Sequence, residues 1–217
     1  MLSGVIFDMD GVLIDSHPAH KVAWRRFLSE VGKDVSDSEL AFVLDGRKRQ
    51  DILRHFLGDL DEQQLSEFGR RKDEYFLALA GTIETVRGLL PFLNELEESR
   101  IPKAVATSAM PSRAHSMLTR LALKQRFSAV VTGQDVVHGK PHPAIFQLAG
   151  ERLGVCPDNL LVIEDAVSGV RAAKAAGMKC LGISSGEHAR ALLAAGADYV
   201  SPDFESLALA DLQTLFN

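Results

Sequence analysis

The second half of the chain alternates short, apolar, strand-like runs with longer amphipathic stretches, and this alternation constrains the fold more than any other feature. The strand-like runs cover residues 103–107, 128–132, 159–164, 179–183 and 198–200. Helical periodicity precedes each of them, over residues 86–99, 111–123, 142–153, 167–176 and 187–195. Strands that alternate with helices of this length form right-handed βαβ units and a parallel sheet with helices on both faces. The pattern predicts an α/β fold with a doubly wound, Rossmann-like parallel sheet.

A further strand is expected near the start of the chain, at residues 4–8, where Val5–Phe7 is a short apolar run. Asp8 and Asp10 follow this run and precede Gly11. Two carboxylates at the end of a buried strand are costly unless protons or a cation offset their repulsion, and such oxygen ligands suit Mg²⁺. A surface turn explains an isolated Asp-x-Asp-Gly sequence equally well, because both residue types are common in turns.

About 65 residues with helical periodicity separate this first strand from the others, far more than a crossover helix requires. We therefore predict a sheet domain of residues 1–15 and 82–217, interrupted by an all-helical cap of residues 16–81. The cap's first helix is expected to have Ser16 as its N-cap and Pro18 in its first turn. Its later helices are expected near residues 36–43, 47–57 and 61–80.

Polar side chains also follow the later strands, and ligands of doubly wound folds bind at the carboxyl ends of the strands. Thr107 and Ser108 supply hydroxyls for phosphate oxygens, Glu164 and Asp165 supply a second pair of acids, and Lys140 adds a cation. Each has an ordinary alternative as a helix cap, a dipole-favoured acid or an exposed loop residue. Their occurrence at successive strand ends favours one shared phosphate and metal site.

Composition excludes several other classes of function. The net charge is −5 without a long basic run, so we expect neither nucleic acid nor an anionic membrane as a partner. No apolar stretch approaches the length of a membrane span, and the first residues lack the pattern of an export signal. The two cysteines, Cys156 and Cys180, do not form a disulfide framework. We expect a cytoplasmic monomer.

With these residues in this order, the whole chain resembles the haloacid dehalogenase-like hydrolase superfamily, in its phosphatase and phosphomutase branch. Asp8 to Val12 resembles the first motif, Thr107-Ser108 the second, Lys140-Pro141 the third and Glu164-Asp165 the fourth. The resemblance implies that Asp8 is the nucleophile and Asp10 the general acid and base.

The same resemblance implies a Mg²⁺ ion held by Asp8, the main-chain carbonyl of Asp10, Asp165, and Glu164 either directly or through water. Thr107 and Lys140 would neutralise the phosphate, and a cation beside Asp8 should keep that carboxyl ionised.

The cap resembles that of β-phosphoglucomutase-like proteins, which implies substrate-binding roles for residues in three cap segments. These residues are His20, Trp24, Gly46, Arg49 and Lys72. His20 could instead be a core histidine on the apolar face of its helix, and Arg49 and Lys72 could be solvated helix charges.

The chain departs from the mutase pattern at residues 109–111, where the mutase presents polar groups to a distal phosphate. Ser112 and Arg113 are the candidates to replace them. Loss of distal-phosphate donors favours a phosphatase acting on a small phosphorylated sugar or similar metabolite. The alternatives are a β-phosphoglucomutase-type isomerase and a non-catalytic protein that binds a phosphorylated metabolite.

Overall fold

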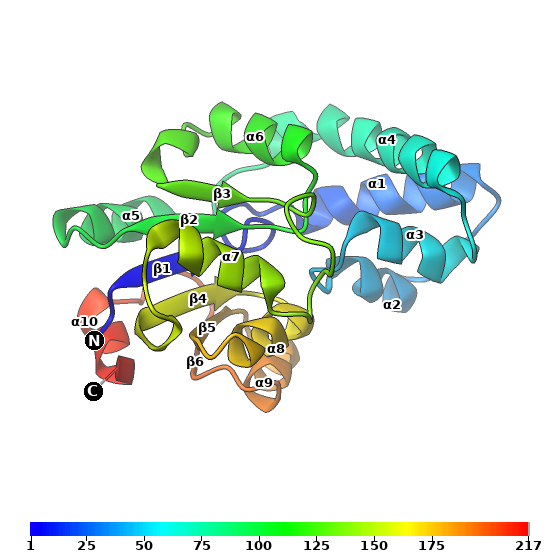
Figure 1. The fold of residues 1–217 in the computed structure, drawn as a ribbon. Helices are drawn as coiled ribbons and strands as arrows, with labels where there is room; N and C mark the ends of the chain where they lie inside the picture. Colours follow the sequence, from blue (N-terminus) through cyan, green and yellow to red (C-terminus); the bar gives the residue numbers. More distant parts are fainter. Residues whose placement is uncertain (217) are drawn as a thin grey trace.

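The computed structural model describes residues 1–216 and contains a six-stranded parallel sheet in the order β3-β2-β1-β4-β5-β6 (Figure 1). The strands are β1 (Gly4–Phe7), β2 (Lys103–Ala106), β3 (Ala129–Val131), β4 (Leu160–Glu164), β5 (Lys179–Ile183) and β6 (Tyr199–Ser201). Strand β1 lies at the centre, where Phe7 pairs with Val105 of β2 and with Ile163 of β4. The α/β fold and every expected strand are confirmed.

Alternate residues of each central strand face opposite sides of the sheet and belong to two separate apolar clusters. Val5 and Phe7 join the cluster covered by α5 (Leu89–Glu98), α6 (Pro111–Arg120) and α10 (Leu209–Gln213). Ile6 joins the cluster covered by α7 (Ala144–Leu153), α8 (Val167–Ala175) and α9 (Gly186–Ala194). Burial on both faces explains why these strands are apolar throughout rather than alternating. Helix α10 was not expected from the sequence.

Residues 16–81, called the helical segment below, contain helices and connecting turns without a strand. They form α1 (His17–Glu30), α2 (Asp37–Leu40), η1 (Ala41–Leu44), α3 (Arg49–Leu57) and α4 (Glu62–Ala78). These helices gather beyond the sheet edge toward which the strands point (Figure 1). They enclose their own apolar cluster, which includes Trp24, Phe27 and Leu53. The division into two domains at these residues stays a prediction.

The two connections between the helical segment and the sheet lie side by side. The Asp15 backbone N–H donates to the Glu84 carbonyl at 2.9 Å, and Ile14 forms an isolated bridge with Thr85. No helix within residues 1–216 combines the length and hydrophobicity needed to cross a membrane.

Ser16 holds the N-cap position of α1, as expected, but its side chain does not cap the helix. Its backbone is near-helical, with φ of −100° and ψ of −6°, and its side chain makes no capping hydrogen bond. The Ser16 hydroxyl instead donates to Asp10 Oδ1 at 2.7 Å. A residue whose side chain caps a helix normally has an extended backbone, which Ser16 lacks. Its hydroxyl hydrogen is donated to the neighbouring carboxylate, which is a strong acceptor.

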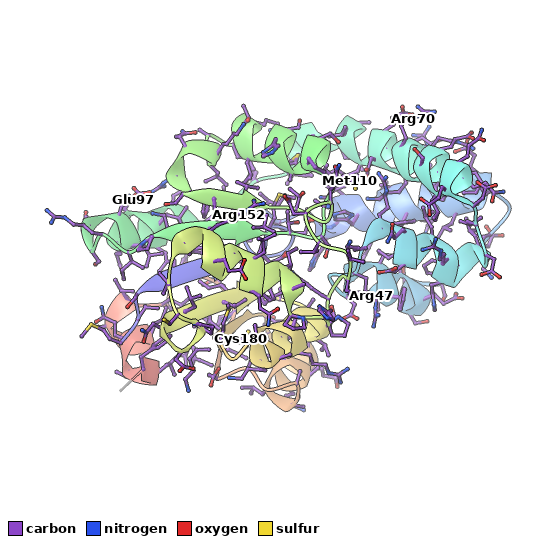
Figure 2. All side chains as sticks on the ribbon, viewed as in Figure 1. Arg47, Arg70, Glu97, Met110, Arg152 and Cys180 are labelled. Carbon is purple, nitrogen blue, oxygen red and sulfur yellow. The ribbon has the colours of Figure 1, made fainter. Side chains whose placement is uncertain are left out.

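Asp135 anchors the start of the loop that leads from β3 to Lys140. Its Oδ2 accepts hydrogen bonds from the Thr132 amide at 2.7 Å and the Thr132 hydroxyl at 2.6 Å. Its Oδ1 accepts a hydrogen bond from Arg152 Nη2 at 2.8 Å, and Figure 2 labels this arginine. Burial opposes ionisation, but these donors lower the pKa of Asp135 to about 2.

We expect Asp135→Asn to lower the free energy of unfolding by about 1–2 kcal/mol at pH 7, because it removes the charge that these donors stabilise. The native pKa lies below the unfolded value of about 3.9, so the contribution is complete above pH 5 and declines as the pH falls toward 2. Urea unfolding at pH 7 and pH 3 should show a smaller difference at pH 3. The exposed Asp158→Asn is the control, and an equal difference at both pH values would contradict the prediction.

Candidate active site

A pocket lies between the carboxyl edge of the sheet and the helical segment, and it collects most of the site residues predicted from the sequence. Met110 and Arg47, which Figure 2 labels, lie on its two sides. The predicted residues that line it are Asp8, Asp10, His20, Trp24, Gly46, Arg49, Lys72, Thr107, Ser108 and Asp165. Lys140 and Glu164 lie directly behind Asp8, as the next contacts show.

Lys140 joins the acids that end β1 and β4. Its ammonium donates to Asp8 Oδ1 at 2.5 Å and to Glu164 Oε1, and its side chain is fully buried. Glu164 Oε2 accepts the backbone N–H groups of Asp165 and Ala166, both at 2.8 Å. Both oxygens of Glu164 are therefore engaged by protein donors. In this arrangement Glu164 holds Lys140, and its part in metal binding, directly or through water, stays a prediction.

The pKa values show that this cluster is short of positive charge. Burial raises the pKa of Asp8 well above its usual range, and the carboxylates of Glu164 and Asp165 add to the rise. Lys140 opposes the rise but does not cancel it. Lys140 thus acts in the expected direction, since a nearby cation lowers the pKa of Asp8, but desolvation raises that pKa more.

A divalent cation fits the remaining ligands. Within residues 1–216 no three His, Cys, Asp or Glu side chains converge as a metal site. With Glu164 bound to Lys140, the side chains left are Asp8 and Asp165, together with the main-chain carbonyl of Asp10. His17 Nε2 lies 2.9 Å from Asp165 Oδ2, yet no donor reaches that buried oxygen with hydrogen-bond geometry. Few protein oxygens, one of them lacking a donor, suit Mg²⁺, which keeps waters for a phosphate to replace.

Asp10 lies at the centre of a second charged cluster. Its Oδ1 accepts hydrogen bonds from Ser16 at 2.7 Å and Arg113 Nη1 at 2.9 Å, and His20 Nε2 lies 3.2 Å away. Its Oδ2 accepts from Arg113 Nη2 at 2.8 Å. Burial opposes ionisation of Asp10, but Arg113 and then His20 hold its pKa well below the usual range. Asp10 is therefore a firmly ionised carboxylate in this arrangement.

His20 connects Asp10 to Lys72. The Lys72 ammonium lies 3.2 Å from His20 Nδ1, and an ammonium can only donate, so Nδ1 accepts and Nε2 carries the hydrogen toward Asp10. Burial and the Lys72 charge lower the pKa of His20 to about 3. Burial also lowers the pKa of Lys72 to about 8, with Arg113 adding to the effect against the attraction of Asp73. His20 faces the site rather than the apolar core of the helical segment.

Arg49 points into the site but is not free. Its guanidinium forms a hydrogen-bonded ion pair with Asp73, which also lies 3.4 Å from Lys72 Nζ. Burial opposes ionisation of Asp73, but Lys72, Arg113 and Arg49 lower its pKa. Only 3% of the Lys72 side chain and 23% of the Arg49 side chain are exposed, so neither is a solvated surface charge.

The two hydroxyls after β2 have different environments. Thr107 Oγ1 accepts the Ala109 N–H at 3.1 Å, which leaves the Thr107 hydroxyl hydrogen available to a phosphate oxygen. Ser108 Oγ donates to the Gly46 carbonyl at 2.6 Å and so joins the sheet to the helical segment. In this arrangement the Ser108 hydroxyl hydrogen is engaged by the protein, and a contact with substrate stays a prediction. Gly46 has φ of +66° and approaches Ala166 so closely that a Cβ would lie 3.3 Å from the alanine methyl group.

Sequence reasoning underrated Arg113 and missed Asp73. Ser112 is exposed, whereas Arg113 is buried and lines the pocket. Arg113 is the third residue of α6, where the positive end of the helix dipole disfavours a cation. A basic residue at that position, just after a strand end rich in site residues, is the signal that an acidic partner lies nearby. Asp73 has no comparable signal, because a Lys-Asp pair is ordinary on a helix surface.

Comparison with known proteins agrees with this geometry. A model of the haloacid dehalogenase-like hydrolase family matches residues 5–183. The chain belongs to this family. It is 35% identical over 187 residues to a fructose-1-phosphate phosphatase from Escherichia coli, covering 83% of this chain and 96% of that protein. It is 37% identical over 204 residues to a phosphorylated carbohydrates phosphatase from Thermotoga maritima, covering 90% and 92%.

Among solved structures, the β-phosphoglucomutase from Clostridium difficile superposes with a TM-score of 0.89 at 25% identity, covering 100% of this chain and 98% of that one. Together, these similarities identify an enzyme of the phosphatase and phosphoglucomutase branch of the haloacid dehalogenase-like hydrolases.

Gly69 in α4 makes room for the Arg49 side chain, since a Cβ there would lie 2.2 Å from Arg49 Nε. We expect Gly69→Ala to push Arg49 away from Asp73 and lower kcat/KM by about tenfold, the worth of one charged hydrogen bond. Thermal stability should not fall, because alanine favours the helix by about 1 kcal/mol. Steady-state kinetics and a melting curve test both parts.

Gly81→Ala is the matched control for this change, since a Cβ there meets nothing within 4 Å. Arg49→Ala should lose the same activity as Gly69→Ala. The prediction would be contradicted if Gly69→Ala kept full activity while Arg49→Ala lost it. That result would mean that Arg49 keeps its position when a methyl group is added at residue 69.

Proposed function

We propose that this protein is a Mg²⁺-dependent phosphatase that hydrolyses a small phosphorylated sugar through an aspartyl-phosphate on Asp8. The observation that carries the proposal is the convergence of Asp8, Asp10, Thr107 and Lys140 on one pocket closed by a helical segment. Two sugar-phosphate phosphatases among the relatives support the substrate class. On this basis, residues 16–81 act as the cap that selects the substrate.

In the first step, an oxygen of Asp8 attacks the phosphorus and the bond from phosphorus to the sugar oxygen breaks. Asp10 must carry a proton for this step, which requires that substrate binding first weaken its contact with Arg113. The departing sugar oxygen takes that proton, so the products of the step are a free sugar hydroxyl, ionised Asp10 and phosphorylated Asp8. Lys140 and the Thr107 hydroxyl lower the repulsion between the carboxylate and the phosphate dianion. Glu164 keeps Lys140 in the position where it can do so.

In the second step, Asp10 takes a proton from a water molecule, which attacks the same phosphorus. The bond from phosphorus to Asp8 breaks, so inorganic phosphate leaves and the Asp8 carboxylate is restored. A bound Mg²⁺, held by Asp8, Asp165 and the Asp10 carbonyl, would supply charge neutralisation for the phosphoryl oxygens. It would also offset the burial that raises the pKa of Asp8.

Hydrolysis is favoured over phosphosugar isomerisation by the charges at the far end of the pocket. A mutase must hold a second phosphate there while it excludes water. In this chain Arg49 is paired with Asp73, and Arg113 is paired with Asp10. The Asp73 carboxylate would repel a second phosphate dianion but accept hydrogen bonds from sugar hydroxyls.

The monomeric state and the cytoplasmic location stay predictions.

We expect Asp8→Asn to lower phosphate release by at least about 10³-fold, because the amide is a poor nucleophile. The assay is a panel of fructose 1-phosphate, glucose 6-phosphate, ribose 5-phosphate and β-glucose 1-phosphate with Mg²⁺, repeated after chelation with EDTA. EDTA should abolish activity, and added Mg²⁺ should restore it. The exposed Asp59→Asn is the control. Tight binding of these sugar phosphates by the wild-type protein without turnover would instead indicate a non-catalytic binding protein.

The choice between hydrolysis and isomerisation can be tested with β-glucose 1-phosphate plus a glucose bisphosphate primer. We expect free phosphate to accumulate without glucose 6-phosphate as an intermediate, because the pocket lacks an unpaired cation for the second phosphate. Coupled assays for the two products decide the outcome. Isomerisation without phosphate release, lost in His20→Ala and Arg49→Ala, would establish the mutase.

A further inference from the structure

Both oxygens of Asp10 are occupied before any substrate is present. Arg113 donates to each of them, at 2.9 Å and 2.8 Å, in the forked geometry that makes arginine–carboxylate pairs strong. Oδ1 has Ser16 as a second donor and His20 as a close neighbour, whereas Oδ2 has Arg113 alone among the hydrogen bonds of the described residues. Oδ2 is thus the oxygen that departure of Arg113 would free.

Arg113 also has a competitor for one of the two oxygens that it contacts. The hydrogen on His20 Nε2 points toward Asp10, so Arg113 Nη1 and His20 Nε2, 3.3 Å apart, are two donors that face each other without a bond. They compete for the same carboxylate oxygen. If Arg113 leaves, Oδ1 keeps Ser16 and His20, which satisfy an ordinary carboxylate oxygen. Removal of Ser16 would leave the two facing donors in place.

The guanidinium of Arg113 lies at the boundary between the two parts of the protein. It comes from the first turn of α6, and its Cζ lies 4.9 Å above the ring of Phe76 in α4. The ends of α6 and α4 approach each other along the top of Figure 1. Arg113 lines the pocket, and Asp73 from the helical segment is the second acid near enough to stabilise its charge. It therefore faces the space that the body of a substrate would fill.

We propose that Arg113 determines specificity for the body of the substrate and that Asp10 holds it only until the substrate binds. Hydroxyl or anionic oxygens of a phosphorylated sugar take over the guanidinium, and Oδ2 of Asp10 is then free to face the oxygen of the scissile bond. An aryl phosphate offers no such oxygens, so Arg113 stays on Asp10. This inference rests on the proposed phosphatase function and adds to it a residue that recognises the sugar.

The test is Arg113→Met, which keeps much of the side-chain length and removes the donors. With the most active sugar phosphate of the panel above, kcat/KM should fall about 10- to 100-fold, the range for loss of hydrogen bonds from a charged donor. With phenyl phosphate, which has no oxygen outside the phosphate and a leaving oxygen that needs a proton, kcat/KM should rise, because Asp10 is no longer held. Ser112→Ala, an exposed neighbour on the same turn, is the control for both substrates.

Arg113→Lys keeps the charge but cannot fork onto both oxygens of Asp10, and it gives a second comparison if Arg113→Met does not fold. Its sugar-phosphate activity should lie between those of the wild type and Arg113→Met. In a crystal structure of Asp8→Asn with the sugar phosphate bound, Arg113 should contact the sugar and lie beyond hydrogen-bonding distance of Asp10 Oδ2.

Equal losses on the sugar phosphate and on phenyl phosphate would overturn this inference. It would also be overturned if Arg113 still donated to both oxygens of Asp10 in that complex. The proposed phosphatase function would stand after either result, provided that the wild-type protein hydrolyses the sugar phosphate. Absence of sugar-phosphate hydrolysis by the wild type would instead refute the proposed function itself.

Discussion

Compensation of buried negative charge at the carboxyl edge of the sheet is the constraint on which the rest of this structure depends. Asp8 and Glu164 end neighbouring parallel strands, so their carboxylates must lie close together in a region that excludes water. Lys140 reaches both of them from a loop that Asp135 anchors. Around Asp8 burial still raises the carboxyl pKa despite Lys140, and this is the position at which we propose that Mg²⁺ binds.

The helical segment is held over this edge by hydrogen bonds from the sheet domain to a short turn. Ser108 donates to the Gly46 carbonyl, and the Ser168 amide donates to Asp45 Oδ1 at 3.1 Å. In the other direction, Lys48 donates to the carbonyls of Val136 and Val137, the latter at 3.0 Å. These contacts fix the turn that precedes Arg49. The residues that hold the segment in place thus also define one wall of the pocket.

The features that the sequence located share a local cause. The strands could be located because two buried faces require apolar runs, and the sequence placed Asp8, Thr107 and Asp165 at strand ends, where they line one pocket. The partners of the polar groups could not be located in this way. The Ser16 hydroxyl donates to Asp10, Glu164 holds Lys140 and Ser108 donates to the Gly46 carbonyl, and none of these contacts is between neighbours in the sequence.

The sequence by itself determined the order of the strands and helices, the inserted helical stretch and the family resemblance, because periodicity and motif spacing are local properties of the chain. The tertiary structure decided which charges meet. Arg113 is about a hundred residues from Asp10 in the sequence, and Asp73 is 24 residues from Arg49, yet each pair is in direct contact. In a desolvated pocket, opposite charges pair according to their distance and orientation in space, and the hydrophobic periodicity of the sequence carries no information about either.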